Sequence, residues 1–250
     1  MSSREPCQAV APVAREIARS AFAKGDRGEG GEDAQIGRQR VRVKICGITT
    51  AEDAEAAVHA GADALGFNTW SGSRRFLDLE KATGWIVDLP CFVTRVALCV
   101  NAPLEEASRI SALPYVDALQ LHGDERSDYC RSIAALGRSW IRAVRLESAG
   151  HIVSLSEWGT RNVLIDAAVA GAYGGTGSRL DLDLAAESVR RCKGLSLTLA
   201  GGLDPENVAE AVRLVRPYAV DVASGVESAP GRKDAAKMRD FVQAVAAACR

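Results

Sequence analysis

Val41-Arg-Val-Lys-Ile-Cys-Gly-Ile48 alternates apolar and charged side chains, and it runs directly into Thr49-Thr-Ala-Glu-Asp53. Side chains of a β-strand point to opposite faces in turn, so the alternation predicts a strand that ends at Cys46. The glycine after it permits a tight turn. Thr49 or Thr50 can then cap a helix whose first turn carries acidic residues, the favourable sign there. The stretch therefore predicts a βα unit with a thiol at the carboxyl end of its strand.

The composition is that of an ordinary globular protein without a surplus of either charge. The 250 residues are 47% hydrophobic and 25% charged, and 31 basic against 32 acidic residues give a net charge of −1. No field of one sign is available to recruit nucleic acid. The apolar runs are shorter than the ~20 residues that a membrane span needs. We therefore expect neither a nucleic-acid partner nor a membrane partner.

The seven cysteines do not form a zinc motif or a disulfide framework. Their number is odd, and none of them forms a Cys-x-x-Cys pair. This pattern predicts free thiols in a reducing cytoplasm and no metal site. All of them except Cys46 are interpreted as small, buried hydrophobic side chains.

The first 40 residues differ from the rest of the chain. Residues 10–24 have the spacing of a short amphipathic helix, and residues 24–33 are rich in glycine and charge. Such a segment has little to bury and behaves as a flexible linker. Its acidic residues and the lack of a continuous apolar core argue against a signal peptide. We expect an N-terminal extension over residues 1–40 and one catalytic domain over residues 41–250.

Strand-like and helix-like stretches alternate from Val41 onward. Further strands are expected at residues 64–70, 94–101, 118–122, 140–146, 162–166, 195–200 and 219–223. Helices are expected at residues 51–60, 79–88, 104–112, 125–136, 149–158, 182–191, 205–215 and 235–248. Strands that are apolar on consecutive positions are typical of a parallel sheet buried on both faces. Eight such units predict an α/β fold, a single-domain (β/α)₈ TIM barrel. An open doubly wound sheet would need a Gly-x-Gly-x-x-Gly turn after the first strand, which is absent.

Active-site groups of such a barrel project from the carboxyl ends of its strands. The residues that end the expected strands are Cys46, Asn68, Asn101, His122, Arg145, Asp166, the pair Gly201 and Gly202, and the pair Ser224 and Gly225. The last three strands are followed by glycine-rich turns, which can close backbone N–H groups on phosphate oxygens. They predict a phosphate site formed by Gly175, Thr176, Gly177, Gly201, Gly202, Ser224 and Gly225.

Cys46 and Asp166 are the candidates for acid–base chemistry. A thiolate can act as a base when nearby cations lower its pKa, and a carboxyl group whose pKa is raised by burial can act as an acid. Such a pair suits proton transfer on a sugar phosphate. The alternative, a buried thiol with a structural aspartate, fits these two positions equally well.

Several motifs together resemble the phosphoribosylanthranilate isomerase family. They are Lys44-Ile-Cys-Gly-Ile48, Leu119-Gln-Leu-His-Gly-Asp-Glu125, Leu164-Ile-Asp166, Gly174-Gly-Thr-Gly177, Leu199-Ala-Gly-Gly-Leu203 with Pro205-Glu-Asn-Val208, and Val220-Asp-Val-Ala-Ser-Gly-Val-Glu227 with Pro230-Gly231 and Lys233-Asp234. The resemblance implies the third step of tryptophan synthesis from anthranilate, an Amadori rearrangement of N-(5-phosphoribosyl)anthranilate without metal or organic cofactor. It also implies that Cys46 is the general base and Asp166 the general acid.

The resemblance further implies substrate contacts. Arg75 takes the place of an arginine that grips the anthranilate carboxylate, although Arg74 replaces the usual proline before it and could compete. His122 contacts the substrate or satisfies a loop carbonyl. Asp221 points into the barrel by alternation, and orients the substrate or pairs with a buried cation.

Three alternatives remain open from the sequence. A sugar-phosphate epimerase would need metal ligands, which the three histidines do not supply as a set. An indole-glycerol-phosphate synthase would need a lysine acid at the end of an early strand. A non-catalytic ligand-binding barrel would not need an intact acid and base. We expect a cytoplasmic enzyme, a monomer or homodimer, whose partner is a small phosphoribosyl-anthranilate substrate.

Overall fold

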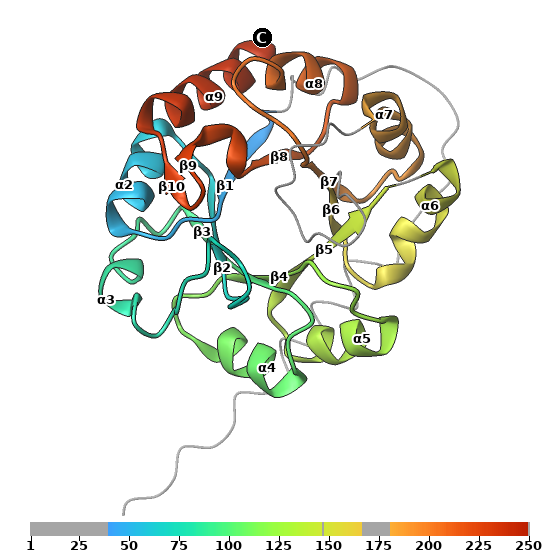
Figure 1. The fold of residues 1–250 in the computed structure, drawn as a ribbon. Helices are drawn as coiled ribbons and strands as arrows, with labels where there is room; N and C mark the ends of the chain where they lie inside the picture. Colours follow the sequence, from blue (N-terminus) through green and yellow to red (C-terminus); the bar gives the residue numbers. More distant parts are fainter. Residues whose placement is uncertain (1–39, 147, 167–180, 250) are drawn as a thin grey trace, which may run out of the picture. The chain divides into compact units, whose positions relative to one another are not determined.

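The computed structural model describes residues 40–146, 148–166 and 181–249. Eight parallel strands close into a barrel in the order of the chain, each paired with its two sequence neighbours and the last with the first. They are β1 (Arg42–Cys46), β2 (Ala64–Asn68), β3 (Thr94–Cys99), β4 (Ala118–Leu121), β5 (Ser139–Arg145), β6 (Asn162–Asp166), β7 (Ser196–Leu199) and β8 (Ala219–Val222). The predicted TIM barrel is confirmed (Figure 1).

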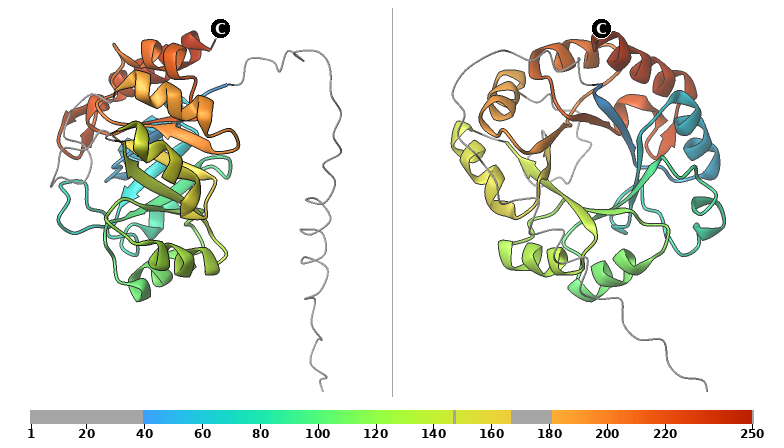
Figure 2. Two further views of the ribbon diagram at one scale, coloured as in Figure 1. Left: turned by 90° about the vertical axis from the view of Figure 1, so that its right-hand side faces the viewer. Right: turned by 180° about the vertical axis from the view of Figure 1, so that it is seen from behind.

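Helices surround the barrel, one after nearly every strand, as the views along the axis from both ends show (Figures 1 and 2). They are α2 (Ala51–Ala60), α3 (Thr83–Ile86), α4 (Leu104–Ala112), α5 (Ser127–Ala135), α6 (Ala149–Ser154) with the 3₁₀ turn η1 (Leu155–Trp158), α7 (Leu182–Arg191), α8 (Val208–Val215) and α9 (Ala235–Ala248). The last helix packs against both α2 and α8 and so closes the ring.

Strand alternation divides the interior into two apolar regions. Side chains such as Val43, Ile45 and Ile165 point outward and form the main core with the helices. Their neighbours point into the barrel, where Ala143, Leu164 and Ala200 form a second, smaller cluster. Both faces of each strand are therefore buried, which explains the consecutive apolar residues in the strands.

The first βα unit forms as its sequence predicts. The hydroxyl of Thr50 accepts a hydrogen bond of 3.1 Å from the backbone N–H of Asp53 and caps α2. Thr49 does not cap the helix, because its hydroxyl donates to the carbonyl of Gly231, 2.7 Å away. This contact ties the first βα turn to the loop after β8, at the carboxyl end of the barrel.

The largest departure from the expected elements lies between β2 and β3. Only α3 is helical where residues 79–88 were predicted to be. The carboxylate of Asp78 accepts hydrogen bonds from the backbone of Glu80 and Lys81, and the hydroxyl of Thr83 donates back to the carbonyl of Glu80 at 2.8 Å. These side chains offer the backbone an alternative to a helix, and Gly84 lowers helix propensity further.

Three elements after β8 were not predicted. A 3₁₀ turn, η2 (Ser224–Val226), leads into a short antiparallel pair, β9 (Glu227–Ala229) and β10 (Arg232–Lys233). The predicted extension lies outside the described residues except for Arg40, as does Cys7. The other cysteines are free thiols, but Cys91 is exposed, so its interpretation as a buried side chain is wrong. Within the described part of the chain, no helix is long and apolar enough to span a membrane.

Candidate active site

A hollow opens at the carboxyl ends of the strands. It is open to solvent and lined by both polar and apolar groups. Of the predicted site residues, it is lined by Cys46, Asn68, Arg75, His122, Asp166, Gly201, Gly202, Asp221 and Ser224. The acid and base candidates therefore lie on one cavity, although β7 and β8 separate their strands.

Cys46 is 6% exposed and points into the barrel. Its sulfur lies beside Gly66, where the position that a Cβ atom would take is 2.6 Å from Cys46 Sγ and 2.9 Å from Lys44 Nζ. Glycine is required there because the thiol and the ammonium group fill the space of a side chain. Burial raises the pKa of the Cys46 thiol, and the neighbouring Lys44 ammonium opposes this rise. The thiolate needed of a base therefore depends on its cationic neighbours.

Lys44 forms an ion pair with Asp221 inside the barrel. Its Nζ donates to Asp221 Oδ1 at 2.7 Å, and the two side chains are only 6% and 8% exposed. Burial alone would lower the pKa of Lys44, but Asp221 and Cys46 outweigh burial and raise it, so the ammonium stays charged. Of the two interpretations of Asp221, pairing with a buried cation describes its contact. A contact with the substrate stays a prediction.

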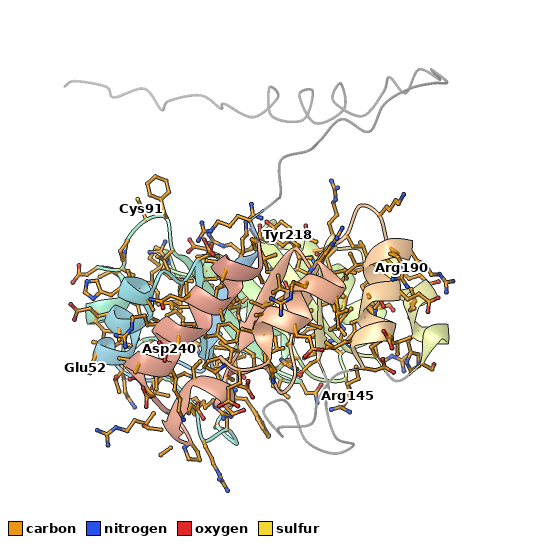
Figure 3. The ribbon with its side chains drawn as sticks, turned by 90° about the horizontal axis from the view of Figure 1, so that it is seen from above. Glu52, Cys91, Arg145, Arg190, Tyr218 and Asp240 are labelled. Carbon is orange, nitrogen blue, oxygen red and sulfur yellow. The ribbon has the colours of Figure 1, made fainter. Side chains whose placement is uncertain are left out.

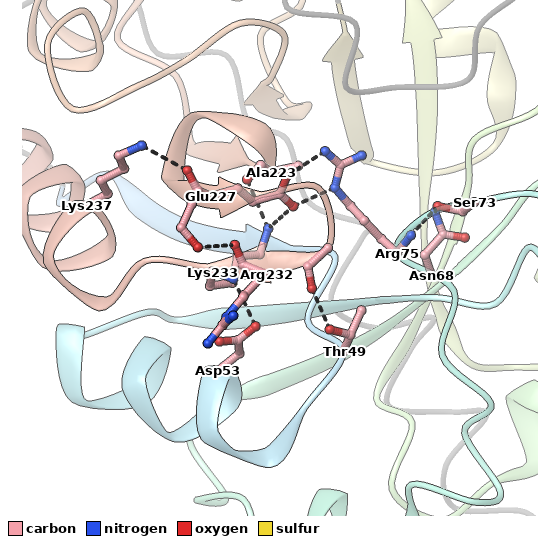
Figure 4. A network of polar contacts seen from close by, with 12 residues as sticks. Thr49, Asp53, Asn68, Ser73, Arg75, Ala223, Glu227, Arg232, Lys233 and Lys237 are labelled. Carbon is pink, nitrogen blue, oxygen red and sulfur yellow. Dashed lines mark hydrogen bonds and ion pairs between the residues drawn. The ribbon is translucent and has the colours of Figure 1, made fainter.

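Arg75 is held by a bidentate ion pair. Its Nε and Nη2 donate to the two oxygens of Glu227 at 2.7 and 2.8 Å. Glu227 also accepts from the fully buried ammonium of Lys233 at 3.0 Å, so one carboxylate joins two cations (Figure 4). These two cations lower the pKa of Glu227, although burial opposes them. Arg75 lines the hollow, whereas Arg74 is exposed and does not.

The free edge of Arg75 is the part available to a ligand. Among the described residues no group bonds its Nη1 atom, and the side chain lies against Gly47, whose Cβ position is 2.4 Å from Arg75 Cδ. A guanidinium group can bind one carboxylate through Nε and Nη2 and a second through its terminal nitrogens. The geometry therefore leaves Arg75 able to take a second carboxylate.

Asp166 and His122 form a hydrogen-bonded pair on the opposite side of the hollow. His122 Nε2 lies 2.9 Å from Asp166 Oδ2, and His122 Nδ1 lies 2.9 Å from Gln120 Nε2. Both ring nitrogens are thus occupied by side chains, so the interpretation that His122 satisfies a loop carbonyl is wrong. The backbone on either side of it is fixed by Arg142, which donates to the carbonyls of Leu121 and Gly123.

The glycine turns at the ends of β7 and β8 pack on one another. Gly201 and Gly202 have φ angles of 95° and 62°, values that favour glycine. The amide of Asn207 donates to the carbonyl of Gly202 at 2.9 Å and fixes this turn. A Cβ atom at Gly225 would lie 1.9 Å from the carbonyl oxygen of Leu203, so only glycine fits there. Gly175, Thr176 and Gly177 lie outside the described residues.

The other strand-end residues take different positions. Asn68 lines the hollow, where its amide donates to Ser73 Oγ and its oxygen accepts from the backbone of Trp70. Asn101 shapes the loop after β3, and its side chain accepts from the backbone of Asp124. Arg145 lines an adjoining hollow that shares His122 and Asp166. Among the described residues, no group of three His, Cys, Asp or Glu side chains is placed to hold a metal ion.

Sequence reasoning assigned no supporting role to the residues that hold the site together, which are Lys44, Gly66, Gln120, Asn207, Glu227 and Lys233. Alternation within β1 and β4 places Lys44 and Gln120 inside the barrel, so a signal existed for these two. Their partners are set by the register between strands, such as the pairing of Lys44 with Asp221. Gly66 lies within β2, and Glu227 and Lys233 lie on β9 and β10, two strands that were not predicted.

A closed (β/α)₈ barrel with polar groups and glycine turns at the carboxyl ends of its strands defines the class of barrel enzymes. A family model described as N-(5'-phosphoribosyl)anthranilate (PRA) isomerase matches residues 43–244. The chain therefore belongs to the phosphoribosylanthranilate isomerase family, as its motifs predicted.

Individual relatives agree with the family. The N-(5'-phosphoribosyl)anthranilate isomerase of Geobacter metallireducens is 48% identical over 203 residues, which are 81% of this chain and 98% of the relative. That of Trichlorobacter lovleyi is 47% identical, over 81% of this chain and 97% of the relative. The crystal structure of the Thermotoga maritima enzyme has a TM-score of 0.74 and 38% identity, and covers 83% of this chain and 99% of that one.

Proposed function

We propose that this chain rearranges N-(5-phosphoribosyl)anthranilate to 1-(2-carboxyphenylamino)-1-deoxyribulose 5-phosphate, with Cys46 as base and Asp166 as acid. The observation that carries the proposal is that both residues line one hollow together with Arg75 and the glycine turns. A solved relative, 37% identical with a TM-score of 0.72, is described in complex with the reduced form of this product. That complex supports the substrate class.

Asp166 and Cys46 provide the two proton transfers that open the ring and form the enolamine. The Asp166 carboxyl group protonates the ring oxygen as the bond from this oxygen to C1 breaks and C1 forms a double bond to nitrogen. The Cys46 thiolate then removes the proton from C2, which gives an enolamine. Protonation at C1 and loss of the hydroxyl proton at C2 yield the ketone. Because C2 is oxidised and C1 reduced within one molecule, the sequence balances without an oxidant or reductant.

The remaining groups bind the two ends of the substrate. The free edge of Arg75 takes the anthranilate carboxylate, while Glu227 keeps the guanidinium in position. Gly201, Gly202, Ser224 and Gly225, with the predicted residues 175–177, bind the phosphate through backbone N–H groups. Asp221 pairs with Lys44 and so holds the Lys44 ammonium group beside Cys46. Through this charge it orients the substrate indirectly.

The test is turnover of freshly prepared phosphoribosylanthranilate, followed as loss of its fluorescence. Cys46→Ala and Asp166→Asn are expected to lower kcat by roughly 100-fold or more, with a smaller effect on KM. Cys99→Ala and Asp117→Asn are matched controls, since Cys99 is a buried thiol outside the hollow and Asp117 pairs with Arg95. A kcat like that of the wild type in either site variant would exclude that residue from the mechanism.

A homodimer is the assembly that we propose. One Thermotoga maritima relative, 36% identical, is described as dimeric, and Phe92 of this chain is 94% exposed. Phe92 follows Cys91 in the loop before β3, and Cys91 lies at the end of the barrel opposite Arg145 (Figure 3). Sedimentation of Phe92→Asp against the wild type tests the proposal, which requires a dimer in the wild type and a monomer in the variant. The cytoplasmic location stays a prediction.

A further inference from the structure

Gln120 is a polar side chain in an apolar part of the barrel. It is fully buried on β4, between Leu98 of β3 and Ile141 of β5 in the sheet register. Its Nε2 atom lies 2.9 Å from His122 Nδ1, and its Oε1 atom has no hydrogen-bond partner among the described residues. A buried amide with an unpaired oxygen is costly, so a leucine would suit the barrel better unless the amide serves His122.

The two nitrogens of the His122 ring are coupled through their hydrogens. A neutral imidazole carries hydrogen on one nitrogen and accepts on the other, and the bond made by one decides the role of the other. In the structure the NH₂ group of Gln120 faces Nδ1, so Nδ1 accepts and Nε2 carries the hydrogen. Nε2 therefore donates to Asp166 Oδ2, which is the arrangement for an ionised Asp166.

A half-turn of the Gln120 amide reverses this arrangement. The amide oxygen then faces Nδ1 and accepts its hydrogen, and Nε2 becomes an acceptor. As long as the ring is neutral, the bond to Asp166 then persists only if the carboxyl group is protonated and donates. An acid that opens a sugar ring must be protonated before the step and ionised after it, so the two orientations of the amide match the two states that Asp166 passes through.

We propose that Gln120 is a positioning residue for the proton on Asp166: its amide selects which nitrogen of His122 carries hydrogen, and thereby whether Asp166 donates or accepts. The proposal rests on the proposed function only in assigning the acid role to Asp166. The Oε1 atom has no partner while the NH₂ group faces His122 Nδ1, and it accepts the Nδ1 hydrogen after the amide turns. The other titratable or charged groups that line the two hollows around this pair are Cys46, Arg75, Asp124, Arg142, Arg145 and Asp221.

The direct test is ¹⁵N NMR of the His122 ring across pH, beside the pH profile of kcat/KM. Assignment is simple because His59 and His151 are exposed and a His122→Gln variant identifies the remaining signal. We expect the hydrogen of a neutral ring to move from Nδ1 to Nε2 at the pH at which kcat/KM falls. A Nδ1 signal that does not change across this pH, or hydrogen on both nitrogens below it, would overturn the proposal. Since the spectrum needs no turnover, it separates this inference from a failure of the proposed function.

Two variants provide the second test. In Gln120→Glu a carboxylate faces Nδ1 and favours the protonated pair, so the falling limb of the pH profile moves to higher pH. In Gln120→Leu no side chain selects which nitrogen of His122 carries the hydrogen, so kcat falls by about tenfold or more. The melting temperature stays at or above that of the wild type. Gln243→Leu, on the exposed face of α9, is the matched control. Either of two outcomes would show that Gln120 only packs the barrel. In the first, the falling limb of the pH profile stays in place in the Glu variant. In the second, the Leu variant loses activity and melting temperature together.

Discussion

Replacing Lys44 by Met tests whether a buried ion pair supports both the fold and the base. The Lys44 and Asp221 side chains are 6% and 8% exposed and 2.7 Å apart. Removal of one partner leaves the other charge buried and unpaired, which costs about 3–5 kcal/mol. For a chain of this size each kcal/mol shifts the melting temperature by about 2–4 °C, so we expect Lys44→Met to melt roughly 6–20 °C below the wild type.

The same substitution removes a cation from the thiol. Burial already raises the pKa of Cys46, and Lys44 is the largest influence that lowers it. Without Lys44 the pKa rises further, so at a fixed pH near 8 a smaller fraction of the sulfur is thiolate. Each unit of this rise reduces the reactive fraction about tenfold. We expect alkylation of Cys46 by iodoacetamide, measured on its peptide by mass spectrometry, to be slower in Lys44→Met than in the wild type.

The double variant Lys44→Met/Asp221→Leu separates the two effects. Replacing both charges by apolar side chains restores stability to about that of the wild type, because no unpaired charge remains. Asp221 itself raises the pKa of Cys46, so its loss recovers only part of the reactivity. The expected order of alkylation rates is wild type, double variant, single variant. A double variant as reactive as the wild type would refute the argument that Lys44 ionises the thiol.

Three further predictions follow from the same contacts. Gly66→Ala places a Cβ atom 2.6 Å from Cys46 Sγ, and we expect kcat to fall about tenfold or more, whereas Gly84→Ala, with open space around it, keeps wild-type kinetics. Glu227→Gln leaves the buried Lys233 without its anion and lowers the free energy of unfolding by about 3–5 kcal/mol near pH 7. Because the pKa of Glu227 is lowered in the fold, the difference in unfolding free energy between variant and wild type shrinks as pH falls below about 4.3. Urea unfolding at a series of pH values measures this difference. Arg142→Met leaves the buried carboxylate of Glu125 without its cation and frees the loop at His122. We expect calorimetry to show a destabilisation of about 3–5 kcal/mol, and we expect kcat to be reduced at temperatures at which the variant is still folded.

The strands were predictable because a barrel of parallel strands buries them on both faces. Apolar residues on consecutive positions marked β6 at residues 162–166 and β7 near 195–200, and the structure places both within a residue of these bounds. The helix over residues 79–88 was not predictable by the same means. There Asp78 and Thr83 form local hydrogen bonds that compete with the helix, and only the folded chain shows which set forms.

The place of the proposed acid and base was predictable from position, but the electrostatic support of the base was not. The rule that active-site groups end barrel strands placed Cys46 and Asp166 on one hollow. The contact between Lys44 and Asp221 joins residues that are 177 positions apart, and it depends on how β8 is staggered against β1. The register of β8 against β1 cannot be read from the sequence pattern. Alternation therefore left open whether Asp221 serves the substrate or a cation, and only the register decides it.

The charges around Cys46 oppose the effect of burial on its thiol. Lys44, Arg75 and Lys233 are three buried or half-buried cations, and Asp221 and Glu227 are the two anions paired with them. These five groups carry one net positive charge, and both lysines interact favourably with the Cys46 thiolate. Burial raises the pKa of the thiol, and Lys44 and Lys233 limit that rise. The ion pairs that hold β1, β8 and the β9–β10 turn together therefore also place the cations that favour the thiolate.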